Sequence, residues 1–125
     1  MPTLIACLST GKGTWAEVNR IIQSQEWNKV FLITNQFGKD NYTLGKNTEL
    51  VLVDSFPDTP TTVITEQIKK QLKDKIADFE VALNLASGSG KEHMAVLEAV
   101  MQMGLNFRFV AVNRNNVEVL GLKRN

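Results

Sequence analysis

The run Thr3–Leu8 constrains the fold of this chain more than any other segment. A continuous apolar run of this length predicts a strand buried on both faces, as in the centre of a parallel sheet. A glycine-rich segment, residues 9–14, follows it directly. The next apolar residues recur at helical spacing and predict a helix over residues 14–25 with Thr14 as its N-cap: Trp15, Val18, Ile21 and Ile22. The N-terminus therefore predicts a strand, a tight turn and a helix.

Further buried strands are predicted over residues 29–34, 49–54 and 79–85. About a dozen residues rich in Gly, Asn, Asp and Lys separate the second strand from the third, which is close to the minimum for a parallel crossover. At the C-terminus, the apolar runs 107–112 and 117–122 flank a polar turn, Asn113-Arg-Asn-Asn116, and predict a β-hairpin.

Two more helices lie between these strands. One is expected to open at Thr59 as the N-cap and Pro60 as the first helical residue, with an apolar stripe of Ile64, Ile68, Leu72 and Ile76. The other follows residue 90 and carries Met94, Leu97, Val100 and Met101. We interpret these methionines as core residues, because methionine fills irregular gaps in apolar cores.

This alternation predicts an α/β fold, a Rossmann-like three-layer sandwich whose mostly parallel sheet ends in an antiparallel hairpin, over one domain of residues 1–125. In the common doubly wound order the first strand lies beside the fourth, and a ligand crevice opens where the strand order reverses. The glycine-rich segments 9–14 and 84–91 follow those two strands. We therefore expect both segments to border one crevice.

Composition excludes several classes of function. The formal net charge is +1, which argues against general electrostatic binding of duplex DNA or an anionic membrane. The single cysteine, Cys7, can form neither an internal disulfide nor a four-ligand zinc site, so we expect a reducing compartment and no metal or other cofactor. Because the N-terminal apolar run is too short for a secretion signal or a spanning helix, we expect a cytoplasmic location.

The first glycine-rich segment has the parts of an anion cradle. Ser9 and Thr10 offer hydroxyls, Gly11 and Gly13 leave backbone N–H groups free to turn inward, and Lys12 offers a positive charge. A Walker A loop needs glycine five residues before its Gly-Lys pair and Ser or Thr after it. The Gly-Lys pairs of the two glycine-rich segments, Gly11-Lys12 and Gly90-Lys91, do not meet those conditions, which argues against an ATPase or a kinase. The alternative is that the glycines only permit tight turns.

The second segment repeats this chemistry after the fourth strand. Asn84 offers an amide, Ser87 and Ser89 offer hydroxyls, and Gly88 and Gly90 permit close approach of a ligand to the backbone: these are candidate ligand-binding residues. Lys91 falls in the first turn of the next helix, where a cation opposes the helix macrodipole unless an anion lies nearby, so we interpret it as a ligand residue. His93 is either an acid–base group or a surface or capping residue.

The run Asn84-Leu-Ala-Ser87-Gly-Ser89-Gly-Lys91, together with Ser-Thr-Gly-Lys-Gly after the first strand and the C-terminal hairpin, resembles the CRISPR-associated Rossmann-fold (CARF) superfamily. The resemblance covers most of the chain. It implies a role in antiviral defence by a homodimer that binds a cyclic oligoadenylate across its two-fold axis, and some members cleave that ligand without metal. Most relatives carry an appended ribonuclease or winged-helix effector. These 125 residues show none, so a separate effector protein is a candidate partner.

Three classes of function follow. The first is binding of a cyclic oligoadenylate or related nucleotide at a homodimer groove. Its enzymatic form is a metal-independent ring nuclease, in which the ribose 2′-hydroxyl attacks its own phosphodiester, Lys91 stabilises the developing charge, and Ser9 or Thr10 positions the phosphate. His93 is the candidate base. The alternatives are a non-catalytic regulatory protein that binds a protein partner, and a small phosphoester hydrolase.

Overall fold

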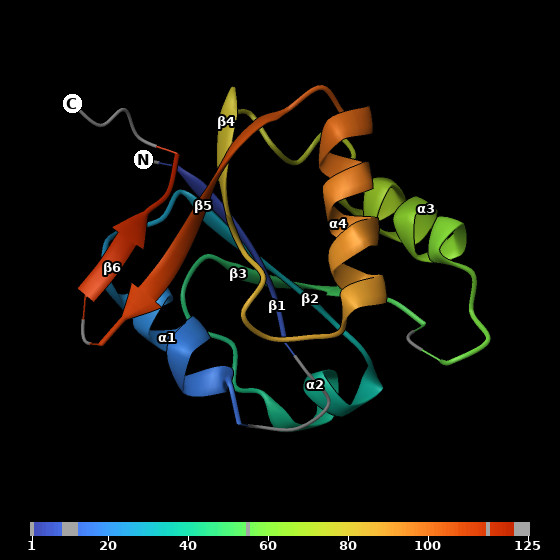
Figure 1. Cartoon of the computed structure of the whole chain (residues 1–125), viewed down its shortest axis with the longest axis horizontal. Helices are drawn as coiled ribbons and strands as arrows, with labels where there is room; N and C mark the ends of the chain where they lie inside the picture. Colours follow the sequence, from blue (N-terminus) through green and yellow to red (C-terminus); the bar gives the residue numbers. More distant parts are fainter. Residues whose placement is uncertain (1, 9–12, 55, 115, 122–125) are drawn as a thin grey trace.

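In a computed structural model, the described residues, 2–8, 13–54, 56–114 and 116–121, form a six-stranded sheet in the order β3-β2-β1-β4-β5-β6 (Figure 1). Five neighbouring strands pair in parallel, and β6 pairs antiparallel with β5. The strand bounds are β1 Thr3–Cys7, β2 Lys29–Thr34, β3 Thr48–Leu52, β4 Glu80–Asn84, β5 Asn106–Asn113 and β6 Asn116–Val119. The predicted α/β fold, parallel sheet and C-terminal hairpin are confirmed.

Helices cover both faces of this sheet. Their bounds are α1 Trp15–Gln23, α2 Gln36–Asn41, α3 Thr61–Leu72 and α4 Gly90–Gln102. Strand β1 is buried on both sides, because Leu4 and Ala6 pack in the cluster that contains α1, and Ile5 packs in the cluster that contains α3 and α4. Phe37 and Tyr42, from α2 and the residue after it, join the α1 cluster. The two clusters are the two cores of a three-layer sandwich.

The helices differ from the sequence prediction in α1, α2 and α3. Helix α1 ends at Gln23 rather than at residue 25. The segment between β2 and β3, for which no element was predicted, contains α2, capped by the Asn35 side chain accepting from Gly38 N at 3.3 Å. Helix α3 begins at Thr61 rather than Pro60, because Pro60 has an extended backbone and acts as the N-cap. It ends at Leu72, so Ile76 lies beyond the helix, although its side chain still packs against the core.

The prediction that Met94 and Met101 are core residues is wrong. Their exposed fractions are 59% and 67%. The face of α4 that packs on the sheet consists instead of Ala95, Val96, Ala99 and Val100. Small side chains at two of these positions let the helix lie close to the sheet, and this leaves the methionines on a second apolar stripe that faces outward.

In the described part of the chain, no helix is both long enough and apolar enough to cross a membrane.

Candidate functional site

The carboxyl ends of β1 and β4 lie side by side at the reversal of the strand order. The register pairs Ala6, which precedes the last residue of β1, with Asn84, the last residue of β4. The helix after β1 packs on one face of the sheet and the helix after β4 packs on the other (Figure 1). The predicted adjacency of the first and fourth strands is therefore confirmed, and both helices begin at this end of the sheet, which we call the switch-point end.

On the β1 side, the prediction for Ser9, Thr10, Gly11 and Lys12 falls outside the described residues. Gly13 lies in a turn, and apart from its chain neighbours no atom of the described residues lies within 4 Å of the position that a Cβ would take. It therefore leaves open space beside the start of α1.

Thr14 occupies the N-cap position of α1, as predicted, but its side chain makes no capping hydrogen bond. Its Oγ1 atom is buried and has no hydrogen-bond partner among the described residues. Buried hydroxyls are rarely left unpaired in folded proteins, and an exception needs an explanation. The Thr14 hydroxyl is therefore a candidate contact for a polar ligand at the switch-point end.

On the β4 side, Gly88 brings the loop against the end of β1. Its φ is +96°, and a Cβ there would lie 3.1 Å from Cys7 Cβ and 3.1 Å from Glu92 Oε1. Both the backbone conformation and this close approach require glycine. The same packing buries the Cys7 thiol; burial, and next the charge of Glu92, raise the pKa of that thiol. Cys7 is therefore a structural thiol, because the thiolate is the reactive form.

The start of α4 is fixed by a capping box that the sequence analysis did not identify. Ser89 is the N-cap; its hydroxyl accepts from Glu92 N at 3.4 Å, and the Glu92 carboxylate accepts from Ser89 N at 2.7 Å. The signal was present in the sequence as Ser-x-x-Glu at the start of an amphipathic run. Gly90 is the first helical residue and, like Gly13, has nothing within 4 Å of a Cβ position.

Two other predicted ligand residues, Asn84 at the end of β4 and Ser87 in the loop that follows, are buried. Asn84 Nδ2 donates to Val110 O at 2.8 Å, and Asn84 Oδ1 accepts from Ala86 N at 3.3 Å, so this amide joins β4 to β5 and to its own loop. Ser87 is 1% exposed, and its carbonyl lies 2.8 Å from His93 Nε2. A carbonyl oxygen can only accept, so Nε2 carries the proton and His93 also holds the loop.

The Lys91 side chain crosses from α4 to the segment before α3. Its Nζ donates to the carbonyl oxygens of Phe56 at 3.0 Å, Pro57 at 2.9 Å and Thr59 at 2.7 Å. The sequence predicted a ligand anion beside this cation; in the structure three backbone carbonyls lie there, and contact of Lys91 with a ligand stays a prediction.

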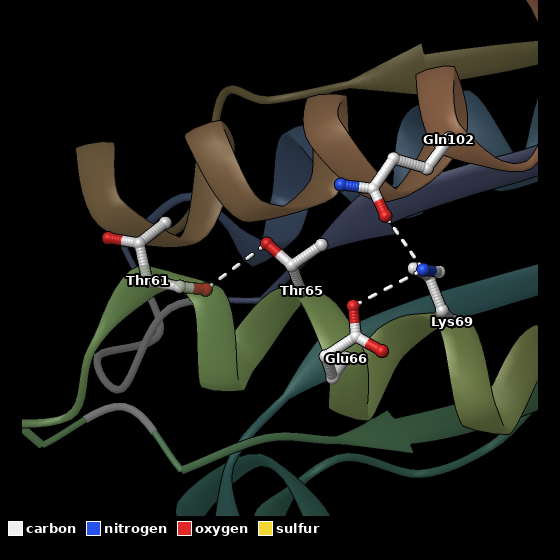
Figure 2. A network of polar contacts seen from close by, with 5 residues as sticks. All are labelled: Thr61, Thr65, Glu66, Lys69 and Gln102. Carbon is white, nitrogen blue, oxygen red and sulfur yellow. Dashed lines mark hydrogen bonds and ion pairs between the residues drawn. The ribbon is translucent and has the colours of Figure 1, made fainter.

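A cavity of about 690 Å³ lies at the other end of the sheet, where α3 and α4 end. Lys69, on its rim, donates to Glu66 at 3.2 Å and to Gln102 at 2.7 Å, which ties α3 to α4 (Figure 2). Two more lysines line it, but Glu66, Asp74 and the negative ends of two helix dipoles lie there too. The electrostatic environment is therefore more favourable for an anion at the switch-point end, where helix N-termini lie.

In the described residues, no group of three or more His, Cys, Asp or Glu side chains is arranged to hold a metal ion.

Fold and site together define a Rossmann-like α/β domain with its candidate site at the switch-point end. Among solved structures, the chain is similar to Enterococcus italicus Csm6 bound to cyclic hexa-2′-fluoro-hexa-dAMP, with a TM-score of 0.57 and 13% sequence identity. The match covers 90% of this chain and 33% of the Csm6 chain, so this chain spans about a third of that protein. No protein-family model and no curated protein matches the sequence. At this identity the similarity establishes the fold.

Proposed function

We propose that this chain binds a cyclic oligoadenylate, or a related nucleotide, at the switch-point end, and that it does so as a homodimer. The observation that carries the proposal is the buried Thr14 hydroxyl, which has no partner among the described residues and lies at the start of α1, the helix that follows β1, the neighbour of β4. The similarity of the fold to Csm6, solved with a cyclic hexanucleotide analogue, supports the choice of ligand class.

The two sides of the site contribute different chemistry. The α4 side offers backbone N–H groups at a helix N-terminus, where anions are stabilised by the helix dipole, and Gly88 and Gly90 leave its backbone free of side chains. The α1 side offers the Thr14 hydroxyl beside Gly13. Ribose hydroxyls and phosphates require this combination of donors and positive potential.

The proposed contacts divide into two groups. Gly11, Lys12 and Gly13, and on the other side Gly88, Ser89, Gly90 and Lys91, contact the ribose-phosphate. Asn84 and Ser87 act indirectly, by holding the loop that presents those residues.

The dimer contact in this proposal is the outward apolar stripe of α4. Met94 and Met101 lie two turns apart with Leu97 between them, on a helix that stands between α3 and β5 (Figure 1). The half-buried rings of Phe107 and Phe109 on β5 pack edge to face with centroids 5.5 Å apart, against the same core as Leu97. Exposed apolar patches of this kind mark protein interfaces, and a two-fold axis would pair the patch with its own copy.

The binding test is titration calorimetry with cyclic tetra-adenylate and cyclic hexa-adenylate, and with linear hexa-adenylate for comparison. We expect a ring to bind and Lys12→Ala to weaken its binding by about 10- to 150-fold, the effect of losing a hydrogen bond to a charged group. Lys70→Ala, on the exposed face of α3, is the matched control and should leave affinity unchanged. If neither ring binds at millimolar concentration, the ligand assignment is wrong.

The assembly test is light scattering at micromolar protein. The wild-type chain should have about twice the 14.0 kDa mass of one copy, and Met94→Glu with Met101→Glu should reduce the mass to that of one copy. Val63→Glu introduces the same charge at another exposed apolar position, on α3, and should remain dimeric. A wild-type monomer, both free and with a ring bound, would contradict the shared groove.

A further inference from the structure

The turn before α3 is closed from two directions. Thr59 N donates to Phe56 O at 3.0 Å, which is the hydrogen bond of a four-residue turn. The Lys91 ammonium accounts for the second closure, because it reaches three carbonyl oxygens of this turn, those of Phe56, Pro57 and Thr59. The Phe56 ring remains 64% exposed, so apolar packing of that ring contributes little to holding the turn.

The ammonium lies where positive potential accumulates. Lys91 is in the first turn of α4, and Thr59 directly precedes Pro60, the N-cap of α3. Two helix N-termini thus disfavour a cation at this point, and the three carbonyl dipoles offset that cost. An anion at the same place would be attracted by both helices and by the lysine.

A lysine ammonium has three N–H donors, and in this structure all three are directed to carbonyls of the turn. It cannot keep these three bonds and also donate to a phosphate. Contact with the phosphate and closure of the turn therefore compete for one side chain.

We propose that Lys91 is a latch: it holds the Phe56–Thr59 turn closed in the free protein, and it leaves the turn for the ligand phosphate when nucleotide binds. This inference rests on the proposed function for its ligand. Release of this turn, which begins at the exposed Phe56 ring, then changes the outer surface of the molecule when the site is occupied.

The test measures amide hydrogen exchange at Thr59 by NMR, because that N–H reports closure of the turn. In the wild-type chain, saturating cyclic hexa-adenylate should raise the exchange rate by about tenfold or more. Lys91→Met keeps an unbranched side chain, one atom shorter, and removes its donors. This variant should show the raised exchange rate at Thr59 without ligand and no further rise with ligand. Lys70→Met, on the exposed face of α3, is the control and should behave as wild type.

Inorganic pyrophosphate, with sodium chloride of equal ionic strength as the control, separates failure of the latch from failure of the proposed function. If neither cyclic ring binds but pyrophosphate alone raises exchange at Thr59, the nucleotide assignment fails and the latch stands. If a ring binds and Thr59 stays protected, the latch is wrong and the binding function stands. If no probe raises exchange, the latch is also wrong. The wild-type measurements need no variant, so they decide the question even if Lys91→Met does not fold.

Discussion

Replacing Thr14 with valine should stabilise the protein and weaken nucleotide binding. Valine has the shape of threonine with a methyl group in place of the hydroxyl. Because Thr14 Oγ1 is buried without a partner among the described residues and makes no capping bond, the substitution removes a desolvation cost and breaks no described contact. An unpaired buried hydroxyl costs about 1–3 kcal/mol, so a gain of about 1 kcal/mol is expected. For a chain of this length that raises Tm by about 3–5 °C.

Affinity should change in the opposite direction. If Thr14 donates to a phosphate oxygen in the complex, its loss removes about 1.5–3 kcal/mol of binding, or about 10- to 150-fold in Kd. The two effects are measured on the same samples, by calorimetric melting of the free protein and by titration with cyclic tetra- and hexa-adenylate. A gain in stability with a loss of binding is the pattern of a residue kept for function.

Thr65→Val is the matched control. Thr65 is as buried as a core residue, but its Oγ1 donates to Thr61 O at 3.1 Å within α3 (Figure 2). The same substitution there breaks a hydrogen bond, so Tm should fall by about 3–5 °C and Kd should stay unchanged. The reasoning is refuted if Thr14→Val lowers Tm as Thr65→Val does, or if it stabilises the protein and leaves affinity for a bound ring unchanged.

Three further results are expected. Gly88→Ala should lower the free energy of unfolding in urea by about 1–3 kcal/mol more than Gly104→Ala. Both glycines have positive φ, but of the two only Gly88 has close neighbours at the Cβ position, so equal losses would contradict the close approach. Because burial raises the pKa of Cys7, the folded state disfavours the thiolate, and above pH 9.0 the stability of wild type relative to Cys7→Ala should fall by up to about 1.4 kcal/mol per pH unit; parallel curves would refute this. If the chain cleaves its ligand, labelled rings should yield 2′,3′-cyclic phosphate ends in excess chelator, more slowly in Lys91→Ala and about 10²- to 10⁴-fold more slowly in His93→Ala. Intact rings at saturation would indicate binding without cleavage.

Much of the fold followed from burial patterns that the sequence displays directly. Strand β1 could be placed at the centre because its run of apolar residues has no polar alternation, and Leu4 and Ile5 indeed pack in opposite cores. The adjacency of β1 and β4, where the strand order reverses, followed in turn, since right-handed crossovers restrict where that reversal can occur.

Helix α4 was oriented incorrectly because it has two apolar stripes. Methionine and leucine are more hydrophobic than alanine, so periodicity alone favoured the stripe of Met94 and Met101. The stripe that contains Ala95 and Ala99 lies closer to the sheet. Which stripe faces the core is decided by how near the backbone can come, and hydrophobicity does not report that distance.

The contacts of Lys91 could not have been predicted for a different reason. Its partners are backbone carbonyls 32 to 35 residues away, and a carbonyl gives no residue-type signal in a sequence. The sequence has a lysine in the first turn of a helix, from which we predicted a ligand anion beside it. It could not show whether that partner belongs to the protein or to a ligand.

The two sides of the switch-point end are held very differently, and this determines how variants there should behave. The α4 side is fixed by the Ser89–Glu92 capping box and by the contact of His93 with Ser87 O, so the loop and the first turn of α4 are in position before a ligand arrives. Such preorganisation reduces the entropy cost of binding. Substitutions on the α4 side should therefore change stability and affinity together. At Thr14 the hydroxyl has no described partner to lose, so its replacement should weaken binding without weakening the fold.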